Sequence, residues 1–328
     1  MSSESDNHED NKNTRRDFIK KVGATALGAA SIVAAPGIVS ANTSKESKSL
    51  PLSGRTALIT GGARGIGRAI AEKLSSQGAN IVVLDIAEPN AMNGVTTYKL
   101  ASPNDLQETE NAITNAGGTI TAIKADVRDR NAMQLAAQTA IDTYGGLDIV
   151  VANAAIATTE DRFENENENK IKQTMDVNVI GVANTISATI PALKQSKSQG
   201  RIIAISSIAG RMGVPNIATY CASKWAVIGL IKSLCLELGE DNITANCIAP
   251  TGVKTSMLLG TNPNDLIGDL NESALDLYLK QKYHSLNKGL LEPSDIADAV
   301  AFLASDEAKY ISGITLDVNA GLSGRITG

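Results

Sequence analysis

The 328-residue chain has few aromatic residues, only two histidines and only three cysteines. Cys221, Cys235 and Cys247 lack metal-ligand spacing and are too few for a disulfide framework, so we expect them to pack as small apolar residues. His8 lies near the N-terminus and His284 in a predicted loop, which argues against a histidine-based triad or a zinc site. The sequence therefore predicts no metal and favours a tyrosine as acid–base group.

The chain also lacks a basic cluster on any predicted helix or sheet face, and its net charge is −5. We therefore expect no nucleic-acid partner. Hydrophobic residues make up 43% and charged residues 20% of the chain, as in ordinary globular proteins, while aromatic residues make up only 3%. The core must be aliphatic. Residues 52–328 are long enough for one large α/β domain, and a second domain is not needed.

The N-terminal segment has the pattern of an export signal. A polar start is followed by Thr14-Arg15-Arg16-Asp17-Phe18-Ile19-Lys20 and a weakly apolar run, which resembles a twin-arginine leader. Small residues before Ala41 predict cleavage after that residue. Residues 1–41 are thus predicted to be a signal peptide and residues 42–51 a polar linker. This predicts a periplasmic or otherwise exported protein, and the alternative is an uncleaved membrane anchor.

Short apolar runs alternate with helical patterns along the rest of the chain. Helices are expected over Arg68–Gln77 and Tyr220–Leu238, and Ser102-Pro103-Asn104-Asp105 is typical of a helix start. Strands separated by helices predict an α/β fold with a Rossmann-type, doubly wound seven-stranded parallel sheet in a single domain. The seven predicted strands are Thr56–Thr60, Asn80–Asp85, Thr119–Asp126, Leu147–Asn153, Arg201–Ser206, Thr244–Ala249 and Ile314–Val318.

Two long segments interrupt this alternation, one over Ile86–Ala101 and one over Thr251–Leu291. Each follows a strand, and ligands of such sheets bind beyond the carboxyl ends of the strands, so both segments are expected to border a site. The second is the better candidate for a lid. Its apolar residues favour a small apolar alcohol or ketone as substrate, although they could instead only dock the lid; they are Met257, Leu258, Leu259, Leu266 and Ile267.

A nucleotide site is predicted after the first strand. Gly61, Gly65 and Gly67 allow a tight turn and a close approach to a pyrophosphate, which the next helix N-terminus attracts. Asp85 ends the second strand, where a carboxylate can bind ribose hydroxyls and repel a 2′-phosphate, so NAD is favoured over NADP. Arg64 is the counter-argument, because a guanidinium can pair with that phosphate.

A catalytic pair is predicted on a later helix. Tyr220 and Lys224 are four residues apart and share a helix face, so the ammonium can stabilise the phenolate and lower the pKa of the phenol. Ser207 lies upstream, at the end of a strand. Asp126 and Asn153 end the third and fourth predicted strands at the same crevice; the alternatives are a helix cap and a turn. This set indicates hydride transfer to or from a nicotinamide.

With these residues in view, the chain from Leu52 onward resembles the short-chain dehydrogenase/reductase family. The matching strings are TGGARGIG, ADV, ANAA, DVNV, ISSIAG, YCASK and APTGVKT. The resemblance implies that Tyr220 is the general acid/base, that Ser207 holds the substrate oxygen, that Lys224 binds the nicotinamide ribose and that Asn178 holds a relay water. It implies nucleotide contacts at Gly61, Arg64, Gly65, Ile66, Gly67, Asp85, Ile86, Asp126, Val127, Asn153, Tyr220, Lys224, Val253 and Thr255.

Longer strings, LDIAEPN, APTGVKTSM and EPSDIADAVAFLASDEAKYISGITLDVNAG, resemble the mycofactocin-coupled, carveol-dehydrogenase-like branch. That resemblance implies a secondary-alcohol dehydrogenase whose NAD stays bound and is reoxidised by an external redox carrier. Homo-oligomerisation as a tetramer is expected by analogy. One alternative is an ordinary ketone or acyl-thioester reductase with exchangeable NAD(P)H. The alternative from another class is a nucleotide-binding protein without catalysis, against which the complete catalytic set argues.

Overall fold

The computed structural model describes residues 49–158, 162–260 and 272–325. The predicted signal peptide, most of the predicted linker and the predicted lid residues Leu266 and Ile267 lie outside these ranges. Residues Ser49–Gly328 group as one unit. None of the helices that the structure describes is long and apolar enough to cross a bilayer.

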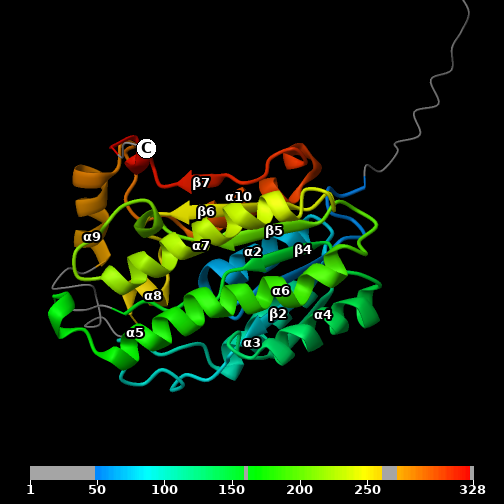
Figure 1. Cartoon of the computed structure of the whole chain (residues 1–328), viewed down its shortest axis with the longest axis horizontal. Coiled ribbons are helices and arrows are strands. Elements are labelled where there is room, and N and C mark those ends of the chain that lie inside the picture. The colour runs from blue at the N-terminus through cyan, green and yellow to red at the C-terminus, as the bar shows by residue number, and fades with distance from the viewer. Residues whose placement is uncertain (1–48, 159–161, 261–271, 326–328) are drawn as a thin grey trace, which may run out of the picture. The chain divides into compact units, whose positions relative to one another are not determined.

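Seven parallel strands form one sheet in the order β3-β2-β1-β4-β5-β6-β7 (Figure 1). In the middle of the sheet, Ile59 of β1 lies between Val83 of β2 and Val151 of β4. The prediction of a doubly wound, seven-stranded parallel sheet is confirmed, with small shifts at the strand ends. The strands are β1 Thr56–Thr60, β2 Asn80–Asp85, β3 Ile120–Lys124, β4 Ile149–Ala152, β5 Arg201–Ile205, β6 Thr244–Pro250 and β7 Thr315–Val318.

Helices cover both faces of the sheet. Figure 1 shows α6 and α7 in front of the sheet, whereas α10 packs against α2. Two π-helical turns, Asp176–Ile180 and Leu279–Tyr283, continue α5 and α9 respectively. The α-helices are α2 Gly65–Ser76, α3 Pro103–Asn115, α4 Arg130–Tyr144, α5 Glu168–Met175, α6 Gly181–Leu193, α7 Ala218–Glu237, α8 Ser256–Leu259, α9 Glu272–Tyr278 and α10 Pro293–Ala304.

The alternation of side chains along the strands divides the core into two layers. Leu58 and Val82 point to the face covered by α4, α6 and α7. Their neighbours Ile59 and Val83 point to the face covered by α2, α3 and α10. Because both faces are covered, the central strands are apolar throughout, as expected for a parallel sheet. The burial of aliphatic side chains on both faces gives the rigid frame on which the loops at the carboxyl ends of the strands are built.

Local signals set the helix ends. Ser102 caps α3 in a capping box with Asp105, which confirms the predicted helix start. Helix α2 begins at Gly65, three residues before the predicted start at Arg68, because the glycine-rich turn runs directly into the helix. Asp129 is the cap of α4, so the alternative role of Asp126 as that cap is wrong.

Candidate active site

A cavity of about 490 Å³ opens at the carboxyl ends of the strands. Every residue predicted to contact the nucleotide lines it, and so does Ser207. These residues come from α2, from α7 and from the end of β2, and from the loops that follow β1 to β6. Asn178 does not line the cavity. The order of the strands explains the convergence. From β1 the chain adds β2 and β3 toward one edge of the sheet, and from β4 it adds β5, β6 and β7 toward the other, so the loops after β1 and β4 diverge and leave a crevice between them.

The glycine-rich turn is packed too closely for side chains. A Cβ on Gly67 would lie 2.0 Å from the Gly61 carbonyl oxygen, and a Cβ on Gly61 would lie 2.9 Å from Asn153 Nδ2. The Asn153 amide donates to the Thr60 carbonyl at 2.9 Å and to the Gly61 carbonyl at 3.2 Å. Asn153 therefore holds the turn in place, and the bare backbone at the start of α2 fits a pyrophosphate.

Asp85 supports the same turn. Its carboxylate accepts from the Ala63 N–H and from the Ala87 N–H, each at 3.1 Å. Burial raises the pKa of this carboxyl, while the two backbone hydrogen bonds and the charge of Arg64 oppose the rise. Asp85 also lines the cavity. This geometry fits the predicted contact with ribose hydroxyls.

The insertion after β2, residues 86–101, contacts the glycine-rich turn. The Arg64 guanidinium donates to the Lys99 carbonyl. The adjacent Tyr98 is buried, and its hydroxyl accepts from the Ala157 N–H in the loop after β4 at 3.1 Å. The insertion thus joins the loops that follow β1 and β4, and the expectation that it borders the site is confirmed. Residues of the insertion that line the cavity are Ile86, Met92, Tyr98, Leu100 and Ala101.

Asp126 follows β3 and is paired within the protein. Arg128 Nε donates to both of its carboxylate oxygens, at 3.1 and 2.8 Å. Arg128 also reaches Gln173 of α5 at 2.6 Å. The pair fixes the loop after β3, whose residues Asp126 and Val127 line the cavity.

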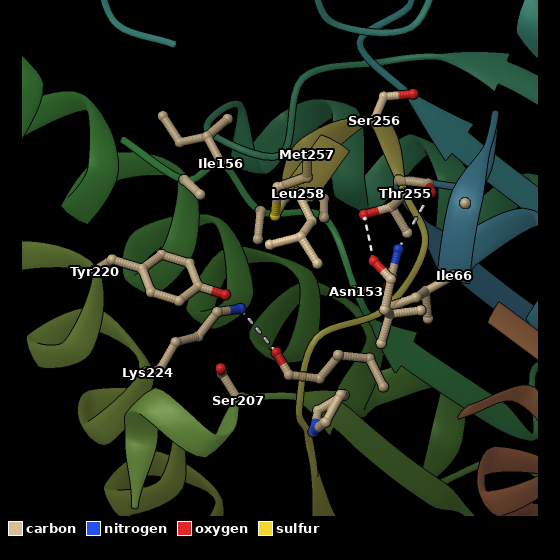
Figure 2. A pocket seen from close by; sticks show the side chains of 18 of the residues that line it. Ile66, Asn153, Ile156, Ser207, Tyr220, Lys224, Thr255, Ser256, Met257 and Leu258 are labelled. Atoms are coloured by element: carbon tan, nitrogen blue, oxygen red, sulfur yellow. Dashed lines mark hydrogen bonds between the residues drawn. The ribbon is translucent and has the colours of Figure 1, made fainter. Parts of the chain in front are cut away.

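Three of the four predicted catalytic residues, Ser207, Tyr220 and Lys224, line the cavity. Tyr220 and Lys224 lie on α7, and Figure 2 shows their side chains and that of Ser207 around the same pocket as Met257 and Leu258. The Lys224 ammonium lies 5.6 Å from the centre of the Tyr220 ring and donates to the Ile205 carbonyl at 2.9 Å. Ser207 Oγ accepts from the Ala209 N–H at 3.1 Å. The arrangement can hold an oxygen and move its proton.

Burial dominates the ionisation of this pair. Burial raises the pKa of Tyr220 to about 12, and the polar side chain of Ser207 opposes the rise. Burial also lowers the pKa of Lys224 to about 8. The prediction that the pKa of Tyr220 lies below its ordinary value is therefore wrong for the protein groups alone, because burial has the largest effect on this phenol and raises its pKa.

Asn178 does not line the cavity but contacts elements that do. Its side chain is buried in the π-helical turn between α5 and α6, where it accepts from the Ile156 N–H at 2.8 Å and donates to the Ile156 carbonyl at 2.9 Å. It also donates to Ser223 Oγ at 3.1 Å. Ser223 in turn donates to the Tyr220 carbonyl. Asn178 therefore ties the loop after β4 to the catalytic helix, and its role as a holder of a relay water stays a prediction.

Mostly apolar residues from the segments that follow β5, β6 and β7 form the far end of the cavity. Sequence reasoning named only some of them. Met257 and Leu258 were expected there from the lid segment and do line it. The signal for the others was weak, because single apolar or aromatic residues in irregular segments do not show where they point. The missed residues are Met212, Val214, Ile217, Leu275, Tyr278, Leu279, Tyr283 and Leu322.

Comparison with known proteins identifies the family. A family model described as enoyl-(acyl carrier protein) reductase matches residues 61–323. A (−)-trans-carveol dehydrogenase from Rhodococcus erythropolis is 35% identical over 271 residues, covering 82% of this chain and 97% of that protein. The chain belongs to the short-chain dehydrogenase/reductase family.

Two solved structures share the fold and carry NAD. A carveol dehydrogenase from Mycobacterium avium, in complex with NAD, is 33% identical with a TM-score of 0.79, covering 84% of this chain and 99% of that one. A short-chain dehydrogenase from Mycobacterium paratuberculosis, bound to NAD, is 34% identical with a TM-score of 0.76, at the same coverage. The expected family and fold are confirmed.

Proposed function

We propose that this protein is an NAD-dependent oxidoreductase that interconverts a secondary alcohol and a ketone. The observation that carries the proposal is the convergence of Ser207, Tyr220 and Lys224 on the cavity that the glycine-rich turn also lines. The carveol dehydrogenase among its relatives supports an alcohol as substrate. The apolar far end of the cavity favours a small apolar molecule.

NAD fits the residues present. The glycine-rich turn would hold the pyrophosphate, and Asp85 would bind the adenosine ribose and repel a 2′-phosphate. Arg64 is engaged by the Lys99 carbonyl, which leaves it less available to pair with such a phosphate. The NAD-bound relatives support the same choice. The other residues that we expect to contact the nucleotide also line this cavity, which supports the proposal.

The nicotinamide supplies the hydride acceptor for alcohol oxidation, or the hydride donor for the reverse reaction. Ser207 holds the substrate oxygen, and Tyr220 exchanges the proton of the hydroxyl at its own phenol oxygen. Lys224 would bind the nicotinamide ribose. The positive charges of Lys224 and of the oxidised cofactor both favour the phenolate, and they oppose the desolvation that raises the pKa of Tyr220 to about 12. Asn178 keeps the catalytic helix and the loop after β4 in register.

Retention of the nucleotide forms part of the proposal. The insertion after β2 is attached to the glycine-rich turn through Arg64 and to the loop after β4 through Tyr98. A segment attached on both sides of a nucleotide site slows nucleotide exchange, because both attachments must open first. A retained NAD would need reoxidation by an external redox carrier. It also fits the proposed export through the twin-arginine route and the periplasmic location, which rest on the leader sequence.

The experiment is to purify the protein without added nucleotide, dialyse it, denature it and identify the released nucleotide by mass spectrometry. Near-equimolar NAD or NADH supports the retained cofactor. An empty protein that turns over free NAD(P)H favours the ordinary ketone or acyl-thioester reductase, and one that binds nucleotide without any turnover favours the non-catalytic alternative. The proposed homotetramer is tested on the same sample by sedimentation.

A further inference from the structure

A pair of tyrosines lies at the apolar end of the cavity. Tyr278 ends α9, and Tyr283 ends the π-helical turn that follows. Both residues line the cavity. The other side chains that the lid contributes from residues 272–283 are Leu275 and Leu279. Tyr278 is 44% exposed and the hydrogen bond between the two phenols is open to solvent, so the pair lies where the cavity meets solvent and adds two hydroxyls to an otherwise aliphatic lid wall.

The π-helical turn explains why these residues meet. The His284 N–H donates to the Leu279 carbonyl at 2.8 Å, a hydrogen bond between residues five apart. Residues 278 and 283 are also five apart and thus stack along the turn. Their ring centres lie 5.2 Å apart at an interplanar angle of 57°, a favourable tilted arrangement. An ordinary α-helical turn would place them on different faces.

The residue after the pair anchors it to the sheet. His284 is buried, and its Nδ1 lies 2.7 Å from the Lys288 carbonyl, which can only accept, so Nδ1 carries a proton. Its Nε2 lies 2.9 Å from the hydroxyl of Thr251, which follows β6 and lines the cavity. The Arg325 guanidinium also donates to the Lys282 carbonyl at 2.6 Å. The pair is therefore held in a fixed position relative to the carboxyl end of β6.

The two hydroxyls form a weak mutual hydrogen bond that leaves donor capacity. Tyr278 donates to Tyr283 at 3.4 Å, well beyond the usual O–H···O separation of about 2.8 Å. At this separation a single oxygen atom can lie within hydrogen-bond distance of both phenols. The Tyr283 hydroxyl proton has no acceptor among the residues that the structure describes. A carbonyl or hydroxyl oxygen, with two lone pairs, matches this arrangement.

We infer that Tyr278 and Tyr283 form a second polar subsite, which selects substrates carrying an oxygen remote from the reacting alcohol. The inference rests on the proposed function and deepens it, since it defines the substrate as an apolar body with oxygen at both ends. Ser207 and Tyr220 bind the reacting oxygen, and the tyrosine pair binds the remote one. The aliphatic wall between them accommodates the hydrocarbon body.

The test compares rigid polycyclic secondary alcohols with and without a ketone on the ring farthest from the hydroxyl, using a series in which the ketone position varies. For the best-fitting member, kcat/KM should exceed that of the plain alcohol about threefold to tenfold, the value of one neutral hydrogen bond. In Tyr283→Phe and in Tyr278→Phe/Tyr283→Phe this ratio should fall to about one. Tyr310→Phe, an 89% exposed residue outside the cavity, is the matched control and should keep the ratio.

Affinity is measured by calorimetry on the same pairs, so that the subsite is tested even without turnover. Equal affinities of wild-type protein for all members of the series, or a preference that survives in the double variant, overturns the inference. If neither class of alcohol is oxidised, the proposed function fails, while the affinity ratio still decides the role of the pair. Because phenylalanine keeps both rings, the stacked arrangement is preserved in the variants.

Discussion

Removal of the Lys224 ammonium should change how stability depends on pH. Lys224 is 3% exposed, and burial lowers its pKa to about 8 from an ordinary value of 10.5. Between these values the unfolded chain binds more protons than the folded chain, so this residue makes stability rise with pH. A fall in pKa from 10.5 to about 8 corresponds to about 3 kcal/mol of unfavourable burial below pH 8.

Lys224→Met keeps most of the buried side chain and removes the charge. The free energy of unfolding is measured with urea at about pH 7 and at about pH 9.5. Its increase from the lower to the higher pH should be about 2 kcal/mol larger in wild-type protein than in the variant. Lys232→Met, at an exposed position of the same helix, controls for the general loss of a lysine. A difference between wild type and Lys224→Met that does not change with pH would refute the reasoning.

Two further predictions concern the nucleotide site. Gly67→Ala places a Cβ 2.0 Å from the Gly61 carbonyl oxygen, so it should lower the free energy of unfolding by about 1–3 kcal/mol and weaken NAD binding. The control is Gly146→Ala, whose Cβ meets open space and which should change NAD affinity little. Asp85→Asn removes the negative charge that repels a 2′-phosphate, so calorimetry should show the preference for NAD over NADP falling at least about tenfold, and an unchanged preference would contradict the assigned role.

The helices and strands were predictable because local sequence features mark them. Apolar strands such as Thr56–Thr60 and Asn80–Asp85 are buried on both faces, so composition alone marks them. The glycine-rich turn was predictable for a similar reason, since only a backbone without side chains allows its close packing. Ser102 was recognisable as a cap from local sequence alone.

Irregular segments were not predictable to the same depth. Sequence placed the insertion after β2 near the site, but it did not show that Tyr98 reaches the loop after β4, because that contact joins residues distant in sequence. The pairing of Tyr278 and Tyr283 depends on a π-helical turn, for which periodicity gives no signal. The pKa of Tyr220 was predicted in the wrong direction, because desolvation depends on packing that a motif does not describe.

The proton-transfer role of Tyr220 is the central claim. Tyr220→Phe removes the hydroxyl and keeps the ring, so the nucleotide content and the free energy of unfolding serve as controls for an intact fold. The most direct measurement is single-turnover reduction of the bound nicotinamide by a secondary alcohol, in wild-type protein and in this variant. The account predicts a rate at least about a hundredfold lower in Tyr220→Phe with the same bound nucleotide. A variant that retains substantial activity would contradict it.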